Sequence, residues 1–131
     1  MNYHIQYGLP FVTVIIQFRG QRLILEKVLL DTGSAGTIFN TDVVGAIGVI
    51  PESEDVVDTI RGVGGVEYVY TKNFDAIYLD SVCLNNFQVE AGNMDYGMEI
   101  DGIIGFDFIQ AAKLIIDTIR MQVYSVDHVN N

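Results

Sequence analysis

Short apolar runs, separated by glycine, asparagine and charged residues, dominate the hydrophobic pattern of this chain. Runs of β-branched and aromatic residues bounded by turn residues are typical of β-strands. The pattern therefore predicts an all-β fold built largely from hairpins. The expected strands cover residues 3–7, 11–18, 22–30, 56–61, 66–70, 76–84, 87–91, 113–117 and 121–126.

Two segments show helical spacing in place of alternation. The first starts at Thr41, a capping-type residue, and ends at Gly48, with Pro51 just beyond. A glycine followed by proline is a common end of a helix. The second helical pattern follows Gly105 and continues through Ala112. We therefore expect one or two short helices in an otherwise β-rich chain.

Turn residues predict where the hairpins reverse. Asn85-Asn86 is expected to be a two-residue turn, because asparagine tolerates positive φ. The glycine-rich run Gly62-Val63-Gly64-Gly65 lies between two strand-like arms and predicts a hairpin with a mobile tip. A phosphate-binding glycine loop is the alternative, but it requires a helix directly after it. Since strand-like residues follow, the hairpin is the preferred interpretation.

One carboxylate stands out against this background. The apolar run Val28-Leu29-Leu30 leads directly into Asp31, which is followed by Thr32-Gly33-Ser34. An unpaired charge beside a dry core is costly, so chemistry is one reason to keep it. A structural turn or capping role for Asp31 is the alternative. The sequence thus marks residues 31–34 as its best candidate site.

Composition and charge narrow the classes of function. The 131 residues suffice for one domain, expected to span residues 1–131. Half of them are hydrophobic and the mean hydropathy is +0.30, which favours a buried subunit interface or a ligand groove. The net charge of −10 repels nucleic acid and anionic membranes, so neither is an expected partner.

Metal, disulfide and targeting features are not recognisable in the sequence. Cys83 is the sole cysteine and is expected to be a small buried hydrophobe. Acidic residues gather at Asp95, Glu99, Asp101 and Asp107, but their spacing does not match a calcium loop, and a solvated rim is preferred. No secretory leader or membrane-length apolar run is visible, so we expect a cytoplasmic protein without a metal or cofactor.

The residues around Asp31 resemble the catalytic loop of retropepsin-like aspartic proteases. The resemblance rests on Asp31-Thr32-Gly33-Ser34 between an apolar strand and Thr37-Ile38-Phe39, on the glycine hairpin, and on the apolar pair and glycine at Ile103-Ile104-Gly105. These features occur in the order found in that family. The resemblance implies a closed, barrel-like acid-protease fold with a flap hairpin.

The family resemblance also implies a role for each motif residue. Asp31 would be the catalytic acid and base, and Thr32 would hydrogen-bond to the loop of a partner subunit. Gly33 would leave room for substrate, and the Ser34 hydroxyl would donate to Asp31 and orient it. The substrate-binding flap would be formed by Gly62, Val63, Gly64 and Gly65. The catalytic loop would be supported from below by Ile103, Ile104 and Gly105.

The chain contains only one Asp-Thr-Gly, whereas this chemistry requires two carboxylates. The second would come from another copy of the chain, so the expected form is a homodimer that cleaves an extended peptide or protein. Phe106 stands where retroviral proteases carry an arginine that ties down the catalytic loop, which puts the viral mode of dimerisation in doubt. The alternative function is a peptide-binding or dimerisation module with little or no catalysis.

Overall fold

The computed structural model describes residues 1–62, 65–94 and 97–126. β-strands make up most of this part of the chain, and its helices are short. In chain order the elements are β1 (His4–Gln6), β2 (Leu9–Phe18), β3 (Gln21–Leu30), β4 (Ile38–Asn40), α1 (Thr41–Val44), the 3₁₀ helix η1 (Gly45–Ile47), β5 (Val57–Gly62), β6 (Gly65–Leu79), β7 (Val82–Gly92), β8 (Gly102–Ile104), α2 (Phe106–Ala111), β9 (Leu114–Asp117) and β10 (Gln122–Ser125).

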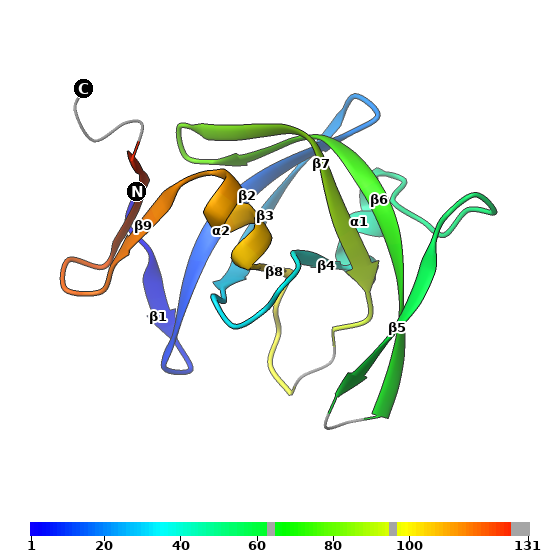
Figure 1. Ribbon diagram of the computed structural model, residues 1–131, viewed down its shortest axis with the longest axis horizontal. Coiled ribbons are helices and arrows are strands. Elements are labelled where there is room, and N and C mark those ends of the chain that lie inside the picture. Colours follow the sequence, from blue (N-terminus) through cyan, green and yellow to red (C-terminus); the bar gives the residue numbers. More distant parts are fainter. Residues whose placement is uncertain (63–64, 95–96, 127–131) are drawn as a thin grey trace.

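The larger sheet curls into a ring around the core (Figure 1). Its strand order is β1-β2-β3-β8-β4-β7-β6-β5, and an additional pairing of β2 with β6 closes the ring. Most neighbours are antiparallel, but β3 pairs with β8, and β4 with β7, in parallel. The predicted all-β, closed architecture is confirmed, although the ring is too irregular to be a true barrel.

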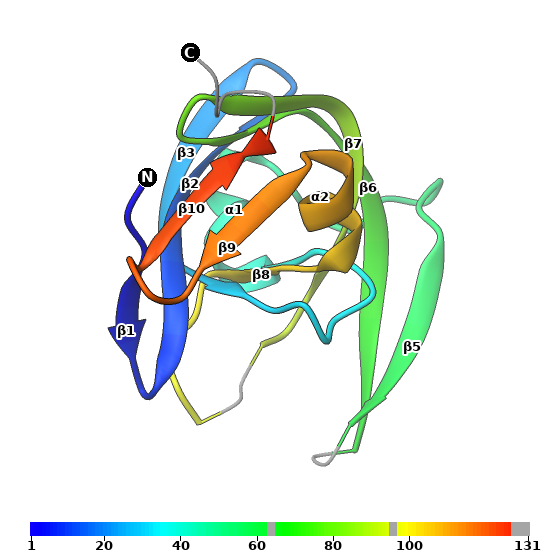
Figure 2. The same ribbon diagram turned by 60° about the vertical axis from the view of Figure 1, so that its left-hand side comes forward.

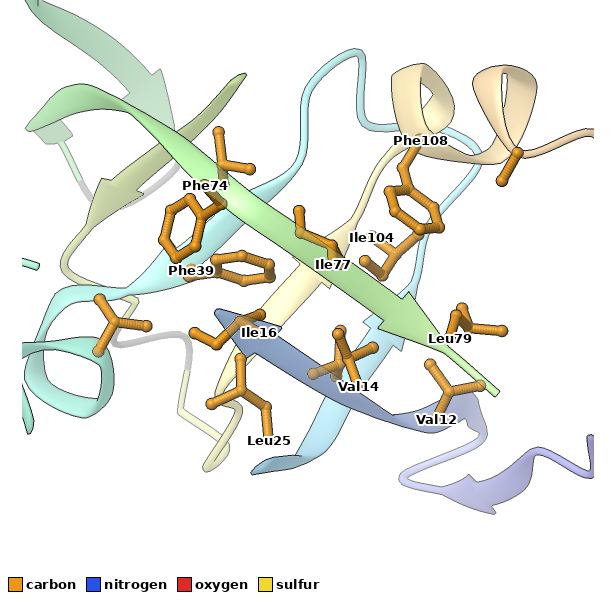
Figure 3. Close-up of a cluster of buried hydrophobic side chains, with 14 of the residues drawn as sticks. Val12, Val14, Ile16, Leu25, Phe39, Phe74, Ile77, Leu79, Ile104 and Phe108 are labelled. Carbon is orange, nitrogen blue, oxygen red and sulfur yellow. The ribbon is translucent and has the colours of Figure 1, made fainter. Parts of the chain in front are cut away.

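Aromatic and branched side chains fill the ring (Figure 3). The rings of Phe39 and Phe74 meet edge to face with their centroids 5.3 Å apart, and Phe18 packs against Phe74 at the same distance. Each large apolar side chain buried in this way contributes about 1.5–3 kcal/mol to the free energy of unfolding. This core fixes the strands that carry the candidate site.

The helices occur where the sequence predicts them. The Asn40 side chain caps α1 by accepting a hydrogen bond from the Asp42 N–H, and the helical segment ends at Gly48, whose φ is 84°. The second helix, α2, begins directly after Gly105. Among the described residues, no helix has the length and apolar character that crossing a membrane demands.

The predicted turn at Asn85-Asn86 is wrong. Both residues lie inside β7, and the chain reverses at Asp80-Ser81, with Leu79 paired to Val82. Asn86 does adopt positive φ, 53°, but Asp80 does so as well, at 54°. Continuous pairing of β6 with β7 through Phe74 and Phe87 outweighs the local turn preference of asparagine.

A long hairpin formed by β5 and the first half of β6 extends away from the ring (Figure 2). The strands pair from Val57 opposite Tyr70 up to Gly62 opposite Gly65. Val63 and Gly64, which belong to the predicted tip, lie outside the described residues. β5 has β6 as its neighbour on one side and forms the outer edge of the sheet.

Both ends of the described chain meet in the smaller sheet. β9 and β10 form an antiparallel pair, and Asn2 makes a bridge with Gln122 on β10. The Tyr3 N–H donates to the Met121 carbonyl over 3.0 Å, and the Val123 N–H donates to the Met1 carbonyl over 2.9 Å. The terminal segments therefore pair with each other within one copy of the chain.

Candidate active site

Asp31 lies where β3 leaves the ring, and its side chain is half-buried. Its backbone N–H donates to the Ile104 carbonyl over 3.0 Å, which fixes the end of the strand. Its carboxylate oxygen Oδ1 accepts the Gly33 N–H over 2.9 Å. Among the described residues no donor meets the other oxygen, Oδ2, so the loop holds one carboxylate oxygen and leaves the other without a protein donor.

The loop after Asp31 turns sharply back on itself. The Ser34 N–H donates to the Asp31 carbonyl over 3.2 Å, and Thr32 and Gly33 are exposed at the turn. The Ser34 hydroxyl donates to the Gly36 carbonyl over 2.8 Å. This differs from the expected Ser34–Asp31 hydrogen bond, because the single hydroxyl proton is already used within the loop. The Gly33 backbone holds the carboxylate instead.

Residues 103–105 lie directly against this loop. Ile103 and Ile104 pair in parallel with Leu29 and Leu30, so β8 supports the strand that ends at Asp31. A Cβ atom on Gly105 would lie 2.3 Å from the Gly36 carbonyl oxygen. The φ of Gly105 is −89°, so the requirement for glycine is a matter of space, not of backbone conformation.

Thr37 joins the same segments, and the sequence did not single it out as a site residue. Its side chain is buried, with 1% of its surface exposed. The Thr37 hydroxyl accepts the Gly105 N–H over 3.0 Å and donates to Asp107 Oδ1 over 2.8 Å. The same Asp107 oxygen accepts the Phe108 N–H over 2.7 Å. One hydroxyl thus links the Asp31 loop, the end of β8 and the first turn of α2.

Phe106 contributes its backbone where retroviral proteases use an arginine side chain. The Phe106 N–H donates to the Ser34 carbonyl over 2.7 Å, so the loop is tied to α2 without a charged tether.

The expected solvated rim of acidic residues is wrong for two of its members. Asp107 bonds Thr37, and Asp101 Oδ2 accepts the Lys27 N–H over 3.1 Å. Asp95 lies outside the described residues.

A cavity of about 530 Å³ opens beside the Asp31 loop, between that loop and the base of the β5–β6 hairpin. Gly36 and Thr37 line one side of it, and Asp58 of β5 and Glu90 of β7 line another. Burial raises the pKa of the Glu90 carboxyl, and the charges of Asp58 and Asp107 raise it further. Among the described residues, no three or more His, Cys, Asp or Glu side chains form a group that could hold a metal ion.

The sequence matches the family model described as aspartyl protease over residues 14–108. This range includes the Asp31 loop, the hairpin and Gly105. The chain belongs to the aspartyl protease family. The fold agrees with a crystal structure of a retropepsin-like aspartic protease from Rickettsia conorii: the TM-score is 0.68, and the match covers 94% of this chain and 95% of that one. At 11% identity this likeness concerns the fold alone. A search of curated protein sequences found no significant match.

Gly105→Ala tests the close approach in this aspartyl protease. We expect it to lower the free energy of unfolding by about 1–3 kcal/mol or more, because the new methyl group collides with the Gly36 carbonyl. Gly45→Ala is the matched control, since a Cβ there meets nothing within 4 Å. Gly45→Ala should change the free energy of unfolding by no more than about 1 kcal/mol. Urea denaturation measures the free energy of unfolding of both variants, and equal stabilities of the two would contradict the prediction.

Thr37→Val tests the bridging hydroxyl while keeping the shape of the side chain. We expect a loss of about 1–3 kcal/mol in the free energy of unfolding, because the buried Gly105 N–H is left without its acceptor. Thr37→Ser keeps the hydroxyl and removes only a methyl group, so the free energy of unfolding should fall by about 0.8 kcal/mol. The urea midpoints should therefore fall in the order wild type, Ser, Val. A serine variant less stable than the valine variant would count against the bridge.

Glu90→Gln should stabilise the protein at neutral pH. Because the folded-state pKa of Glu90 is raised, its ionised form destabilises the fold above that pKa, and this penalty disappears when the carboxyl is protonated. Thermal melts at fixed protein concentration should show a higher Tm for Glu90→Gln at pH 7, and a gain that shrinks as the pH falls through the raised pKa and is absent below pH 4.5, the ordinary pKa. The exposed Glu26→Gln serves as control. A gain independent of pH would refute the electrostatic cause.

Proposed function

We propose that this protein is an aspartic endopeptidase that acts as a homodimer on extended polypeptides, with Asp31 of each copy forming one half of the catalytic pair. The observation that carries this proposal is the Asp31 carboxylate: one oxygen is held by the Gly33 N–H, and the loop is braced by Gly105 and Thr37. Membership of the aspartyl protease family supports it.

The chemistry needs a pair of carboxylates that share one proton. Two carboxylates about 3 Å apart do not both ionise readily, so one stays protonated while the other acts as a base. The ionised member takes a proton from a water molecule held between them, and the water oxygen attacks the peptide carbonyl carbon. The protonated member donates to the carbonyl oxygen. Collapse of the tetrahedral intermediate then passes a proton to the amide nitrogen and releases the two products.

The second carboxylate would come from a symmetry-related copy, since the chain has only one Asp-Thr-Gly. A two-fold axis beside the loop would bring both Asp31 residues together, because a residue near such an axis lies close to its own mate. Thr32, exposed at the turn, is free to hydrogen-bond across this axis. Gly33 would leave space for the substrate backbone.

The substrate would bind as an extended strand beneath the β5–β6 hairpin, with Gly62 to Gly65 acting as the flap. An extended peptide is held by backbone hydrogen bonds, while pockets receive its alternate side chains. The cavity between the Asp31 loop and Asp58 of β5 would accept one of these side chains. The hairpin would exclude water from the scissile bond once it closes.

Asp31→Asn tests the catalytic role. We expect hydrolysis of an unstructured protein between pH 4 and 7 to fall at least ~10²-fold, because the amide cannot exchange a proton with water. The fold and the dimer, followed by circular dichroism and sedimentation velocity, should be unchanged. Asp42→Asn, on the exposed first turn of α1, is the matched control and should cleave normally.

A mixing experiment tests whether both copies contribute to one site. Excess Asp31→Asn protein added to wild type should suppress cleavage, because mixed dimers hold only one carboxylate, whereas excess Asp42→Asn protein should not. Full activity in the presence of excess Asp31→Asn protein would contradict a shared site. A wild-type protein that binds peptides but cleaves none at any of these pH values would favour the binding-module alternative.

A further inference from the structure

A buried ammonium group lies at the base of the hairpin. Lys72 belongs to β6, two residues beyond the hairpin's last pair, and its side chain is only 4% exposed. Its Nζ contacts Glu52 Oε1 at 2.5 Å and Asp55 Oδ2 at 2.8 Å. Both carboxylates come from the loop that leads from η1 into β5. A charge buried to this degree is tolerated only when it is paired, and here both partners come from one loop.

The same loop is held from a second direction. The Arg19 guanidinium, on the turn between β2 and β3, donates to both oxygens of Glu52 over 2.8 and 3.2 Å. Hydrogen bonds from Arg19 and then Lys72 lower the pKa of Glu52 to about 2, and the Lys72 hydrogen bond also lowers the pKa of Asp55. Burial opposes the charge on Lys72, but its bonds to Asp55 and Glu52 outweigh burial and raise its pKa. The network therefore stays charged in mild acid.

This loop determines where the hairpin begins. The Thr71 N–H donates to the Val56 carbonyl over 3.0 Å, one residue before β5 starts. Val56 also lines two neighbouring cavities, together with Thr71 and Gln88. One is the 530 Å³ cavity beside the Asp31 loop, and the other, of about 390 Å³, includes Lys72 and Asp55 in its lining. A shift of the loop would therefore move the wall of the cavity next to the candidate active site.

We propose that Lys72 is a positioning residue for substrate binding: by holding Glu52 and Asp55 it fixes the base of the β5–β6 hairpin over the peptide groove. This inference rests on the proposed endopeptidase function. Without the ammonium group, Glu52 and Asp55 repel each other, and Asp55, now 11% exposed, reaches water only if the loop moves outward. The base of the hairpin would then lose its charged attachment, while Tyr70 keeps its hydrogen bonds to Thr41 and Val49 and the ring keeps its own core.

Lys72→Met tests this role, since methionine fills the same space without the charge. We expect amide hydrogen exchange to accelerate at least about tenfold in residues 57–62 and 65–70, with no change in β2 and β3. The KM for a peptide substrate should rise about tenfold with little change in kcat, because the groove and not the reacting groups is altered. Lys27→Met is the matched control, since it removes a cation paired with Glu99 away from the hairpin; its exchange and KM should match wild type.

Three results would overturn the proposal: unchanged exchange in the hairpin, equal acceleration in β2 and β3, or a loosened hairpin with an unchanged KM. If Lys72→Met does not fold, Glu52→Gln removes one of the two anionic partners and should give a smaller acceleration confined to the same residues. If wild type hydrolyses no peptide, the proposed function fails. Exchange then decides the anchoring role alone, with acceleration confined to the hairpin supporting it and any other pattern overturning it.

Discussion

The close approach of Gly105 to Gly36 is the constraint on which the candidate site depends. It brings the end of β8 within reach of the Thr37 hydroxyl and places the Phe106 N–H against the Ser34 carbonyl. Asp31 is then held at both ends of its loop, by Ile104 before the turn and by residues 105–107 after it. A carboxylate on a glycine turn would otherwise sample many orientations, so this packing preorganises it.

The base of the hairpin combines two kinds of interaction. Apolar packing dominates the ring, where Phe39, Phe74 and their neighbours exclude water. Tyr70 extends this packing to the base of the hairpin, where its hydroxyl also donates to the Val49 carbonyl. Two residues further along β6, Lys72 adds a charged contact, enclosed by Glu52 and Asp55. The hydrophobic effect is non-directional, whereas a buried ion pair demands defined geometry, so the charges add a fixed position to a packed base.

Local patterns predicted much of the fold. Hydrophobic runs identified most of the strands, and Thr41, Gly48 and Gly105 marked limits of the helices correctly. The short strands β4 and β8 were not predicted, and the expected strand 76–84 crosses the turn between β6 and β7. The Asn85-Asn86 turn failed because turn preference is local, whereas the pairing of β6 with β7 depends on residues throughout both strands. Thr37, Asp107 and Lys72 were missed for a related reason. Thr37 and Asp107 are hydrogen-bonded to each other across 70 residues of sequence, and Lys72 meets Glu52 across 20. No rule of sequence spacing connects such side chains at those separations.

The edge position of β5 has a consequence for the behaviour of the protein in solution. An outer strand offers unpaired backbone groups to any extended chain, and Val56, Val57 and Tyr68 add exposed apolar surface around it. An extended segment of a neighbouring molecule can add a strand at this edge, so β5 is a site where aggregation can begin. The net charge of −10 opposes aggregation through mutual repulsion. Acid, which protonates carboxylates, and high salt, which screens their charge, would therefore favour aggregation through β5.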